Sequence, residues 1–331
     1  MSPPEVRTFV VPADLAGLRL DVALARLSPD LTRSRVQRLS EGGHVRLAGK
    51  VAKPSARLRG GEPLEVELEP PAPTGAVAQD LPLAVLHEDR DLLVLDKAAG
   101  MVVHPARGSP HSTVVNALLH LLAGGHSPRV RSARVPSIAG EPPFVGLVHR
   151  LDKDTSGCLV VARTEAALQA LQAQWKGRTV EKVYLALCHG ALPDTGRLDT
   201  PYGRHPRDRT RFTGRLRTAS RRALTEWRVV ERFGPAATLA EVTLHTGRTH
   251  QIRVHLAEAG HPLLGDAVYG GTRREARDPG GLAARAAAAA GRQALHAARL
   301  AFDHPRTGKR LAFEAPLPED LRRALEVLRK G

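Results

Sequence analysis

The sequence predicts an α+β fold in two domains joined by a short linker. Apolar and polar residues alternate at residues 64–68 and in similar short runs, a period typical of strands with one buried face. Strands of this kind commonly form antiparallel sheets. Other stretches, such as residues 168–175, repeat apolar residues at helical spacing. A stiff proline-rich linker at 71–80 separates a small domain at 1–70 from a larger one at 81–331.

The overall charge points to a polyanionic partner. The chain has 331 residues, which is enough for two domains, and a net charge of +15 at pH 7. This balance favours nucleic acid over a membrane surface, although a generically basic protein would show the same charge. Aromatic residues make up only 3% of the chain, so a broad stacking platform for bases is not expected.

The remaining bulk features favour a cytoplasmic protein without a cofactor. Cys158 and Cys188 both lie in apolar, strand-like runs and are expected to be reduced thiols of the core. The sequence shows neither a signal peptide nor an apolar run of transmembrane length. It also lacks a phosphate-binding Walker A loop, a dinucleotide fingerprint and zinc-ligand spacing, so no metal is expected.

The first domain is predicted to hold two helices and a small sheet. An apolar stripe from Leu18 to Leu27 indicates the first helix, and Thr32 suits the N-cap of a second helix that ends at Gly42. Short strands are expected on both sides of a turn at Ala48 and Gly49. Basic side chains gather on the second helix and beside the turn: Arg33, Arg35, Arg38 and Lys50.

The second domain is predicted to open with a hairpin at residues 83–95, followed by a helix at 114–122. Residues 123–142 are rich in Gly, Ser, Pro and Arg, which is typical of a flexible loop. Further along, Thr164 suits the N-cap of a helix that ends at Gly177. A later helix, with Thr249 as its expected cap, ends before Gly260.

The stretch at residues 148–157 is the strongest candidate site. It is a polar loop between two apolar, strand-like runs, a place where rigid scaffolds often hold functional groups. Asp152 lies between Arg150 and Lys153, and these cations favour its ionised form. A calcium loop is excluded because the required Glu at its twelfth position is Arg163 here. A plain polar turn remains an alternative for the loop by itself.

Two other stretches carry candidate functional residues. In the alternating run at residues 181–188, Tyr184 lies on the opposite face from Val183, where it either faces a cleft or is a core tyrosine. Residues 202–222 carry a dense set of arginines, which predicts a phosphate-contacting surface loop. Its central members are Arg207, Arg209 and Arg211. His250 and His255 are five residues apart, which is not the spacing of a helical zinc pair.

Four motifs in order resemble one known family. They are H-R-L-D-K-D-T-S-G at 149–157, K-x-Y-x-A at 182–186, T-G-R-T-H-Q-I-R-V-H-L followed by G-H-P-L-x-G-D, and R-Q-A-L-H-A-A-R-L near the C-terminus. Together they resemble RNA pseudouridine synthases of the RluA/RluD type. The motifs G-x-R-L-D, T-R-S-R-V-Q and G-x-V-R-L-A-G-K of the first domain resemble the RNA-binding domain of ribosomal protein S-four.

The resemblance implies a fold and roles for particular residues. The catalytic domain is expected to be α+β with a bent, mostly antiparallel mixed sheet. Asp152 would be the catalytic residue, Arg253 would pair with it, Tyr184 would stack on the target base, and Arg150 would fill the space that the base leaves. The residues expected to contact RNA are Arg33, Arg35, Arg38 and Lys50 of the first domain and Arg207, Arg209, Arg211, Arg248 and His250 of the second.

The expected function is isomerisation of specific uridines to pseudouridine, in large-subunit ribosomal RNA, by a monomer that needs no cofactor. A transfer-RNA substrate and a non-catalytic role in ribosome assembly are the alternatives. A glycoside hydrolase would need two carboxylates flanking the scissile bond, and Asp154 is only two residues from Asp152. A ribonuclease is disfavoured because no paired-histidine or metal-carboxylate site is evident.

Overall fold

The computed structural model describes residues 5–28, 31, 33–68, 76–105, 109, 111–124, 144–217 and 221–331, without the side chains of Glu5, Ser34, Arg35 and Arg38. The chain forms two compact units, Met1–Gly75 and Ala76–Gly331. Thr32, most of the predicted flexible loop and residues 71–75 of the predicted linker lie outside the described residues. No helix in the described ranges is both long and apolar enough to cross a bilayer.

The first unit packs two helices on a four-stranded sheet, as its apolar pattern predicts. Val36 and Leu39, from the inner face of the second helix, and Leu64 and Val66, from the alternating strand, are buried in one core. Ala48 and Gly49 both have positive φ, which gives the tight turn of the predicted hairpin. The sheet order is β1-β4-β2-β3. The elements are β1 (Glu5–Val10), a 3-10 helix (Ala13–Leu15), α1 (Leu20–Leu27), α2 (Arg33–Glu41), β2 (Val45–Leu47), β3 (Lys50–Val51) and β4 (Pro63–Leu68).

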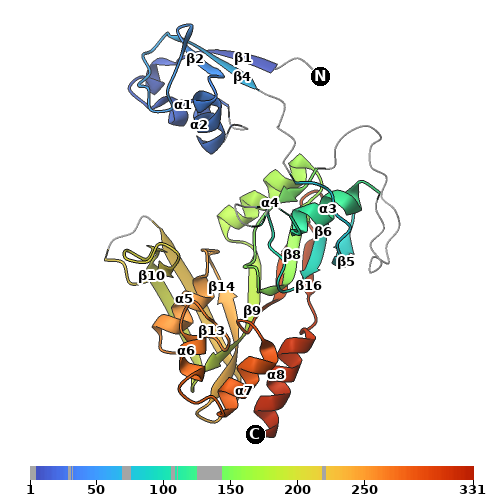
Figure 1. Cartoon of the computed structure of the whole chain (residues 1–331). Coiled ribbons are helices and arrows are strands. Elements are labelled where there is room, and N and C mark those ends of the chain that lie inside the picture. The colour runs from blue at the N-terminus through green and yellow to red at the C-terminus, as the bar shows by residue number, and fades with distance from the viewer. Residues whose placement is uncertain are drawn as a thin grey trace. The chain divides into compact units, whose positions relative to one another are not determined.

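The second unit is built on a ten-stranded mixed sheet with helices beside it (Figure 1). Its main path is β10-β13-β14-β9-β15-β8-β6-β5, with β16 on β15 and β7 on β8. The strands are β5 (Ala84–Glu88), β6 (Leu92–Lys97), β7 (Gly146–Leu147), β8 (Ser156–Ala162), β9 (Glu181–His189), β10 (Thr195–Pro201), β13 (Arg222–Phe233), β14 (Ala237–Leu244), β15 (Leu295–Asp303) and β16 (Arg310–Glu314). A separate hairpin pairs β11 (Gly203–Arg204) with β12 (Phe212–Thr213).

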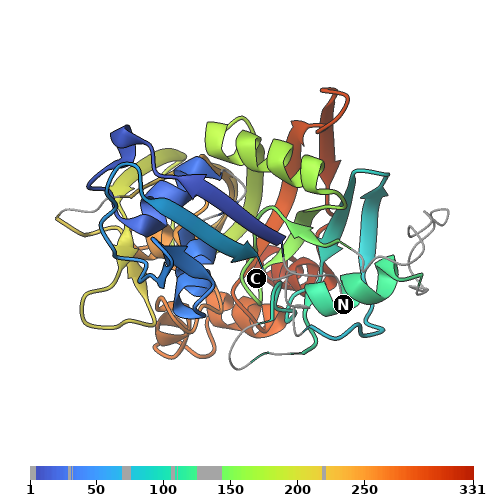
Figure 2. The same cartoon turned by 90° about the horizontal axis from the view of Figure 1, so that it is seen from above.

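The helices of this unit are α3 (Val114–Leu122), α4 (Glu165–Gly177), α5 (Gln251–Glu258), α6 (Gly271–Glu275), α7 (Leu282–Ala290) and α8 (Glu319–Lys330). α4 packs against β8 and β15, and α7 lies beside α8 (Figures 1 and 2). Thr164 caps α4 as predicted, because its side chain accepts a hydrogen bond from the Ala167 amide. The predicted α+β class and mixed sheet are therefore confirmed.

One parallel contact at the middle of the sheet fixes the candidate loop. β8 pairs parallel to β15 at Ser156 and Gly157, whereas its contact with β6 is antiparallel. Gly157 has a φ of 110°, and a Cβ there would lie 2.2 Å from the Ala297 carbonyl oxygen. The glycine is therefore required for this close approach of the two strands. The register of β15 against β9 shifts between His296 and Arg299, an irregularity that bends strands.

Candidate active site

The loop between β7 and β8 presents Arg150 and Asp152 on either side of a buried residue. Leu151 is buried in the main core of the unit, which holds the loop down at its centre. The Thr155 amide closes a turn by donating to the Asp152 carbonyl oxygen over 3.1 Å. Because the neighbours of a buried side chain point away from it in an extended segment, Arg150 and Asp152 are both directed toward the cavity beside the loop.

Lys97, at the end of β6, hydrogen-bonds to the backbone of the same loop. Its side chain is only 1% exposed, and its ammonium donates hydrogen bonds to the carbonyl oxygens of Ala98, Met101 and Lys153 at 2.7, 2.8 and 2.9 Å. Burial lowers the pKa of Lys97 to about 8. The ammonium thus joins the segment after β6 to the loop that carries Asp152.

Asp152 meets a guanidinium that a second carboxylate holds in place. Arg253 Nη1 donates to Asp152 Oδ2 over 3.0 Å, and the Asp152 side chain is 17% exposed. Arg253 Nε and Nη2 donate to the two oxygens of Asp266 at 2.7 and 3.0 Å. This planar, two-bond contact fixes the orientation of the guanidinium. Asp266 is itself fully buried and accepts from the backbone amides of Val268 and Tyr269.

The opposite charges of Arg253 and Asp266 offset the unfavourable effect of burial on each other. Burial acts to lower the pKa of Arg253, but the hydrogen bonds and charge of Asp266, with a smaller effect of Asp152, raise it. For Asp266, burial acts to raise the pKa, but the guanidinium and the two backbone amides hold it below its ordinary value. The arginine is therefore a permanent cation, and one of the N–H groups that Asp266 leaves free, on Nη1, donates to Asp152.

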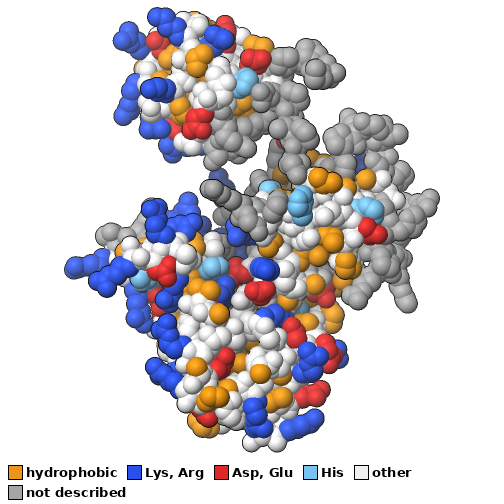
Figure 3. Space-filling model, viewed as in Figure 1, with side chains coloured by type: hydrophobic (Ala, Val, Ile, Leu, Met, Phe, Trp, Pro, Cys, Tyr) orange, Lys and Arg blue, Asp and Glu red, His pale blue; other side chains and the backbone are white. Residues whose placement is uncertain are grey.

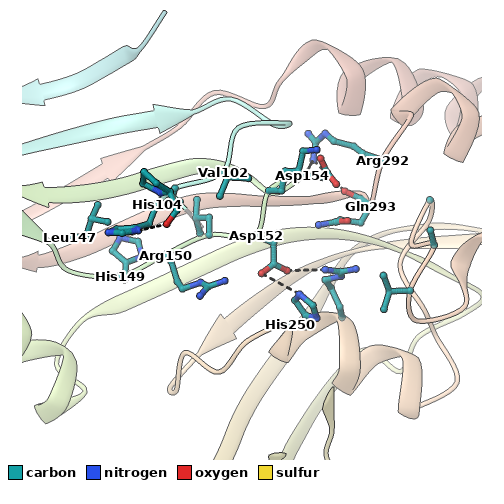
Figure 4. Close-up of a pocket in the computed structure, with 18 of the residues that line it drawn as sticks. Val102, His104, Leu147, His149, Arg150, Asp152, Asp154, His250, Arg292 and Gln293 are labelled. Atoms are coloured by element: carbon teal, nitrogen blue, oxygen red, sulfur yellow. Dashed lines mark hydrogen bonds and ion pairs between the residues drawn. The ribbon is translucent and has the colours of Figure 1, made fainter. Parts of the chain in front are cut away.

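His250 approaches Asp152 from the other side, at the start of α5 (Figure 4). Its Nε2 lies 3.9 Å from Asp152 Oδ1, and its Nδ1 lies 2.9 Å from the Tyr269 hydroxyl oxygen. That hydroxyl accepts a hydrogen bond from the Phe212 amide, so its own proton is free to be donated to Nδ1. In the neutral tautomer in which Nδ1 accepts from this hydroxyl, Nε2 carries the proton and faces the carboxylate. Burial lowers the pKa of His250, against the opposing effect of Asp152.

Two adjoining cavities surround these groups. The larger, of about 990 Å³, is lined by Asp152, Arg253 and His250 and extends past Arg292. The smaller, of about 220 Å³, shares Arg150 and Asp152 and adds Tyr184. The volume of the larger cavity is typical of a small-molecule site. Figure 4 shows Arg150 beside Asp152 at the larger cavity.

The Tyr184 hydroxyl and the Arg150 guanidinium both lack a hydrogen-bond partner among the described residues. Among the described residues, no group hydrogen-bonds to the Tyr184 hydroxyl, and none pairs with the exposed Arg150 guanidinium. Burial, and then the charge of Asp152, raise the pKa of Tyr184, so the phenol is neutral near pH 7. The cavity can thus offer a bound molecule an aromatic ring, an exposed cation and a carboxylate.

Comparisons with known proteins identify the family. The family model described as RNA pseudouridylate synthase matches residues 91–258, and an S4 domain model matches residues 18–64. The chain is 44% identical to "Ribosomal large subunit pseudouridine synthase D" of Xanthomonas campestris, over 98% of this chain and 93% of that protein. The chain belongs to the RNA pseudouridylate synthase family. It is also 44% identical to an RNA pseudouridine synthase of Chloroflexus aurantiacus, over 98% of this chain and 94% of that one.

A solved structure agrees with this assignment. The human protein "RNA Pseudouridylate Synthase Domain Containing 4" superposes with a TM-score of 0.54 at 25% identity, covering 74% of this chain and 93% of that chain. The predicted family, the α+β fold with an S4 domain, and the enzyme class are therefore confirmed: the chain is an RNA pseudouridine synthase.

The structure brings most residues singled out in the catalytic domain to one place. Five of them line the smaller cavity together with Asp152: Arg150, Tyr184, Arg248, His250 and Arg253. They come from the loop before β8, from β9 and from the start of α5, segments far apart in the sequence. The expected Thr249 cap of α5 is wrong. His250 occupies the N-cap in a left-handed conformation, and the Gln251 side chain accepts from the Arg248 amide instead.

The arginine-rich segment is more ordered than the surface loop that its charge predicts. The hairpin β11–β12 lies within it, and Tyr202 and Phe212 pack in a small core with α5. Arg207 and Arg209 are exposed, as expected for phosphate contacts. Arg211 is half-buried, lies 5.2 Å from the centre of the Tyr269 ring, and has a buried Nε without a hydrogen-bond partner in the described structure. The prediction of a loop without core contacts was wrong because its aromatic residues were ignored.

The predicted RNA-contacting residues of the first unit differ in their exposure and in their contacts with the rest of the protein. Lys50 is exposed in its hairpin. Arg33 remains 57% exposed, but its Nε also donates to the buried Asp21 carboxylate over 3.1 Å. The side chains of Arg35 and Arg38 are outside the described part of the structure. Figure 3 shows Lys and Arg side chains gathered on one edge of this unit and, in the second unit, over the region of β10.

Sequence reasoning missed two residues that organise the site. Asp266 ends the motif G-H-P-L-x-G-D, so its position in a recognised motif was the available signal. Tyr269 follows it by three residues and supports Arg253 and His250 at once, with its ring 5.2 Å from the Arg253 guanidinium. An isolated tyrosine carries no comparable signal in the sequence.

Asp89, Asp91 and His304 also lie close enough together to hold a metal ion, away from the cavity. Their polar atoms are already engaged, because Asp89 Oδ2 lies 2.9 Å from His87 Nε2 and 3.1 Å from His304 Nε2. Arg306 Nε donates to Asp91 Oδ2 over 2.8 Å. These bonds join the turn after β5 to the turn after β15, and we assign the cluster a structural role.

Proposed function

We propose that the chain converts specific uridines of large-subunit ribosomal RNA to pseudouridine, with Asp152 as the catalytic carboxylate. The observation that carries the proposal is the alignment of Asp152 with Arg253, which Asp266 holds from behind, at the mouth of a cavity. The names of the curated relatives, including the protein of Xanthomonas campestris, support the RNA target. The S4 domain at residues 18–64 supports a structured RNA as the substrate.

The target nucleotide must leave its helix before it reaches Asp152. The cavity of about 220 Å³ beside Tyr184 lies within the protein, and a base of a duplex can enter such a pocket only after it has left its stack. Tyr184 would stack on the flipped base, since its ring lines this cavity. Arg150 is exposed and unpaired among the described residues, so its planar guanidinium can enter the RNA stack that the base has left.

The reaction is an isomerisation and needs no co-reactant. The bond from N1 of uracil to C1′ of ribose breaks, and a bond from C5 to C1′ forms. C5 loses its proton, and N1 gains one, so atoms and electrons balance. Asp152 can attack C1′, add to the ring or remove a sugar proton. In each case its carboxylate must lie beside the nucleotide, and the Arg253 hydrogen bond orients it.

Basic side chains outside the cavity would hold the surrounding RNA. Arg207 and Arg209 project from the β11–β12 hairpin segment, and Arg248 borders the cavity that Tyr184 lines. His250 would sit closest to the nucleotide. In the first unit, Lys50 and the basic residues of α2 would contact phosphates. Such contacts add affinity and register without reading sequence.

The proposal also covers the oligomeric state of the enzyme and the compartment in which it acts. Asp152, Arg253, Tyr184 and Arg150 form one site without a contribution from a second subunit, so we expect the enzyme to act as a monomer. The ribosomal target named for the relatives supports action in the cytoplasm. Light scattering of the purified protein tests the first part.

Mapping of pseudouridines in ribosomal and transfer RNA, with and without the gene, tests the target. We expect loss of specific large-subunit sites, restored by the wild-type gene and not by Asp152→Asn. Loss confined to transfer RNA would replace the proposed substrate. An unchanged map, with RNA binding retained, would favour a role in ribosome assembly.

A further inference from the structure

Lys182 is a buried cation that faces the proposed nucleotide cavity without a partner. It lies on β9 two residues before Tyr184, its side chain is 7% exposed, and both residues line the same cavity. Among the described residues, no acceptor hydrogen-bonds to its ammonium, and no carboxylate lies within ion-pair distance. Lys97 is a useful contrast, because its ammonium, on a side chain that is 1% exposed, has three carbonyl acceptors.

The surroundings of Lys182 leave its charge uncompensated. Burial, and then the charge of Arg178, lower the pKa of Lys182, and no acidic group offsets them. Burial and the charge of Lys182 both lower the pKa of His149. Its Nε2 accepts a hydrogen bond from the Val160 amide, so Nδ1 of the neutral ring carries the proton, and neither nitrogen can accept a hydrogen bond from Lys182. The Lys182 ammonium opens onto the cavity and has no acceptor among the described residues, so a ligand that brings an acceptor oxygen would bind there favourably.

We propose that Lys182 binds a carbonyl oxygen of the target uracil and stabilises the negative charge that the base acquires when its glycosidic bond breaks. This rests on the proposed function. Alternate residues of a strand project to the same face at about 6–7 Å spacing. If the Tyr184 ring stacks on the base, Lys182 therefore meets the edge of that base. A phosphate is the less favoured acceptor, because the more exposed Arg248 borders the same cavity and is free to contact phosphate.

The chemistry gives this contact a role in rate and in base choice. When the N1–C1′ bond breaks, its electron pair stays with uracil and spreads onto O2 and O4. A cation placed beforehand at such an oxygen stabilises that charge more than the neutral base. Lys182 donates a hydrogen bond and keeps its proton, so the overall balance does not change. Cytosine carries an amino group at C4, where a donor would meet a donor, so contact at O4 would also select uracil.

Single-turnover kinetics on a short uridine stem-loop test the proposal. Lys182→Met should keep RNA affinity within about threefold and lower the rate of the bound complex about 100- to 1,000-fold, the usual effect of losing one such donor. Lys182→Arg should recover part of the rate. The control is Lys176→Met, which removes the same charge from an exposed position on α4 and should leave the rate unchanged. Melting curves establish that each variant is folded.

Substituted substrates identify the atom that Lys182 contacts. Replacing O2 or O4 of the target uracil by sulfur weakens the acceptor, so one of these changes should slow the wild type and have little further effect on Lys182→Met. If the sulfur substitution and Lys182→Met slow the reaction independently at both O2 and O4, the proposal is overturned. If Lys182→Met is instead non-additive with a phosphorothioate at a flanking phosphate, Lys182 contacts the RNA backbone and not the base. A wild-type rate that Lys182→Met does not change overturns this inference alone, whereas failure of the wild type on all uridine RNA would contradict the proposed function itself.

Discussion

Replacing Asp266 by Asn should misplace the guanidinium that faces Asp152 without removing it. Asp266 is fully buried, and its two oxygens receive Arg253 Nε and Nη2 as well as two backbone amides. An asparagine of the same shape has one oxygen and one NH₂ group. Whichever way the amide turns, its NH₂ group faces the guanidinium, and in one orientation it faces the backbone amides as well.

The structure sets the size of the effect. The Arg253 side chain is 6% exposed and Asp266 is 0% exposed, so solvent cannot replace the lost carboxylate. Removing one partner of such a buried pair costs about 3–5 kcal/mol in the free energy of unfolding. For a domain of this size, that lowers Tm by roughly 6–20 °C. A displacement of about 1 Å at a catalytic group costs about 100-fold in rate, which we expect for the single-turnover rate.

Calorimetry and single-turnover kinetics, measured well below the lowered Tm, separate the two effects. Asp194→Asn is the matched control, because Asp194 is 89% exposed and pairs with Arg232 at the surface, where such a pair contributes about 0–1 kcal/mol. An Asp266→Asn protein with the Tm and rate of the wild type would show that the buried carboxylate does not orient Arg253.

Three further predictions follow from other contacts. Tyr269→Phe removes the hydroxyl that bonds to His250 Nδ1, at a cost of about 1 kcal/mol, so KM for the RNA should rise about fivefold with kcat unchanged; a fall in kcat alone would contradict this role. His255 is 1% exposed, and burial lowers its pKa to about 4, below the unfolded value of about 6.5. Between these values only the unfolded state binds the proton, so stability should fall by about 3 kcal/mol as pH drops from 6.5 to 4. Denaturant titrations should show a smaller fall for His255→Gln, and equal falls would refute the assignment. Arg209→Ala should raise KM for the RNA and reduce the log–log salt slope of binding by about 0.7. Arg211→Ala also loses the contact with Tyr269, so this variant should lower kcat as well. Identical kinetics for the two variants would contradict this distinction.

Periodicity and motif order predicted most of the fold and the centre of the site. The stripe of α1, the alternation of β4 and the hairpin β5–β6 follow from local patterns, because each element buries one face. The approach of Asp152 to Arg253 could be expected only from the family resemblance. Local patterns contain no information on two residues that are 101 positions apart and meet through the packing of α5.

What the sequence left out depends on tertiary packing. Whether an arginine is a free surface cation or is packed against a tyrosine is decided by a neighbour far along the chain, as with Arg211 and Tyr269. Lys97 and Lys182 are both lysines in strands, and only the structure distinguishes the one with three carbonyl acceptors from the one that faces a cavity. Their different roles could not be read from residue type or spacing.

The most direct measurement of the central claim is release of tritium from carbon 5 of uridine in a labelled RNA stem-loop, by Asp152→Asn and Asp154→Asn proteins. The two variants remove the same charge from the same loop, but only Asp152 contacts Arg253. We expect Asp152→Asn to bind the RNA and release no tritium above background, while Asp154→Asn retains activity within about tenfold of the wild type. Tritium release by Asp152→Asn at a wild-type rate would contradict the account.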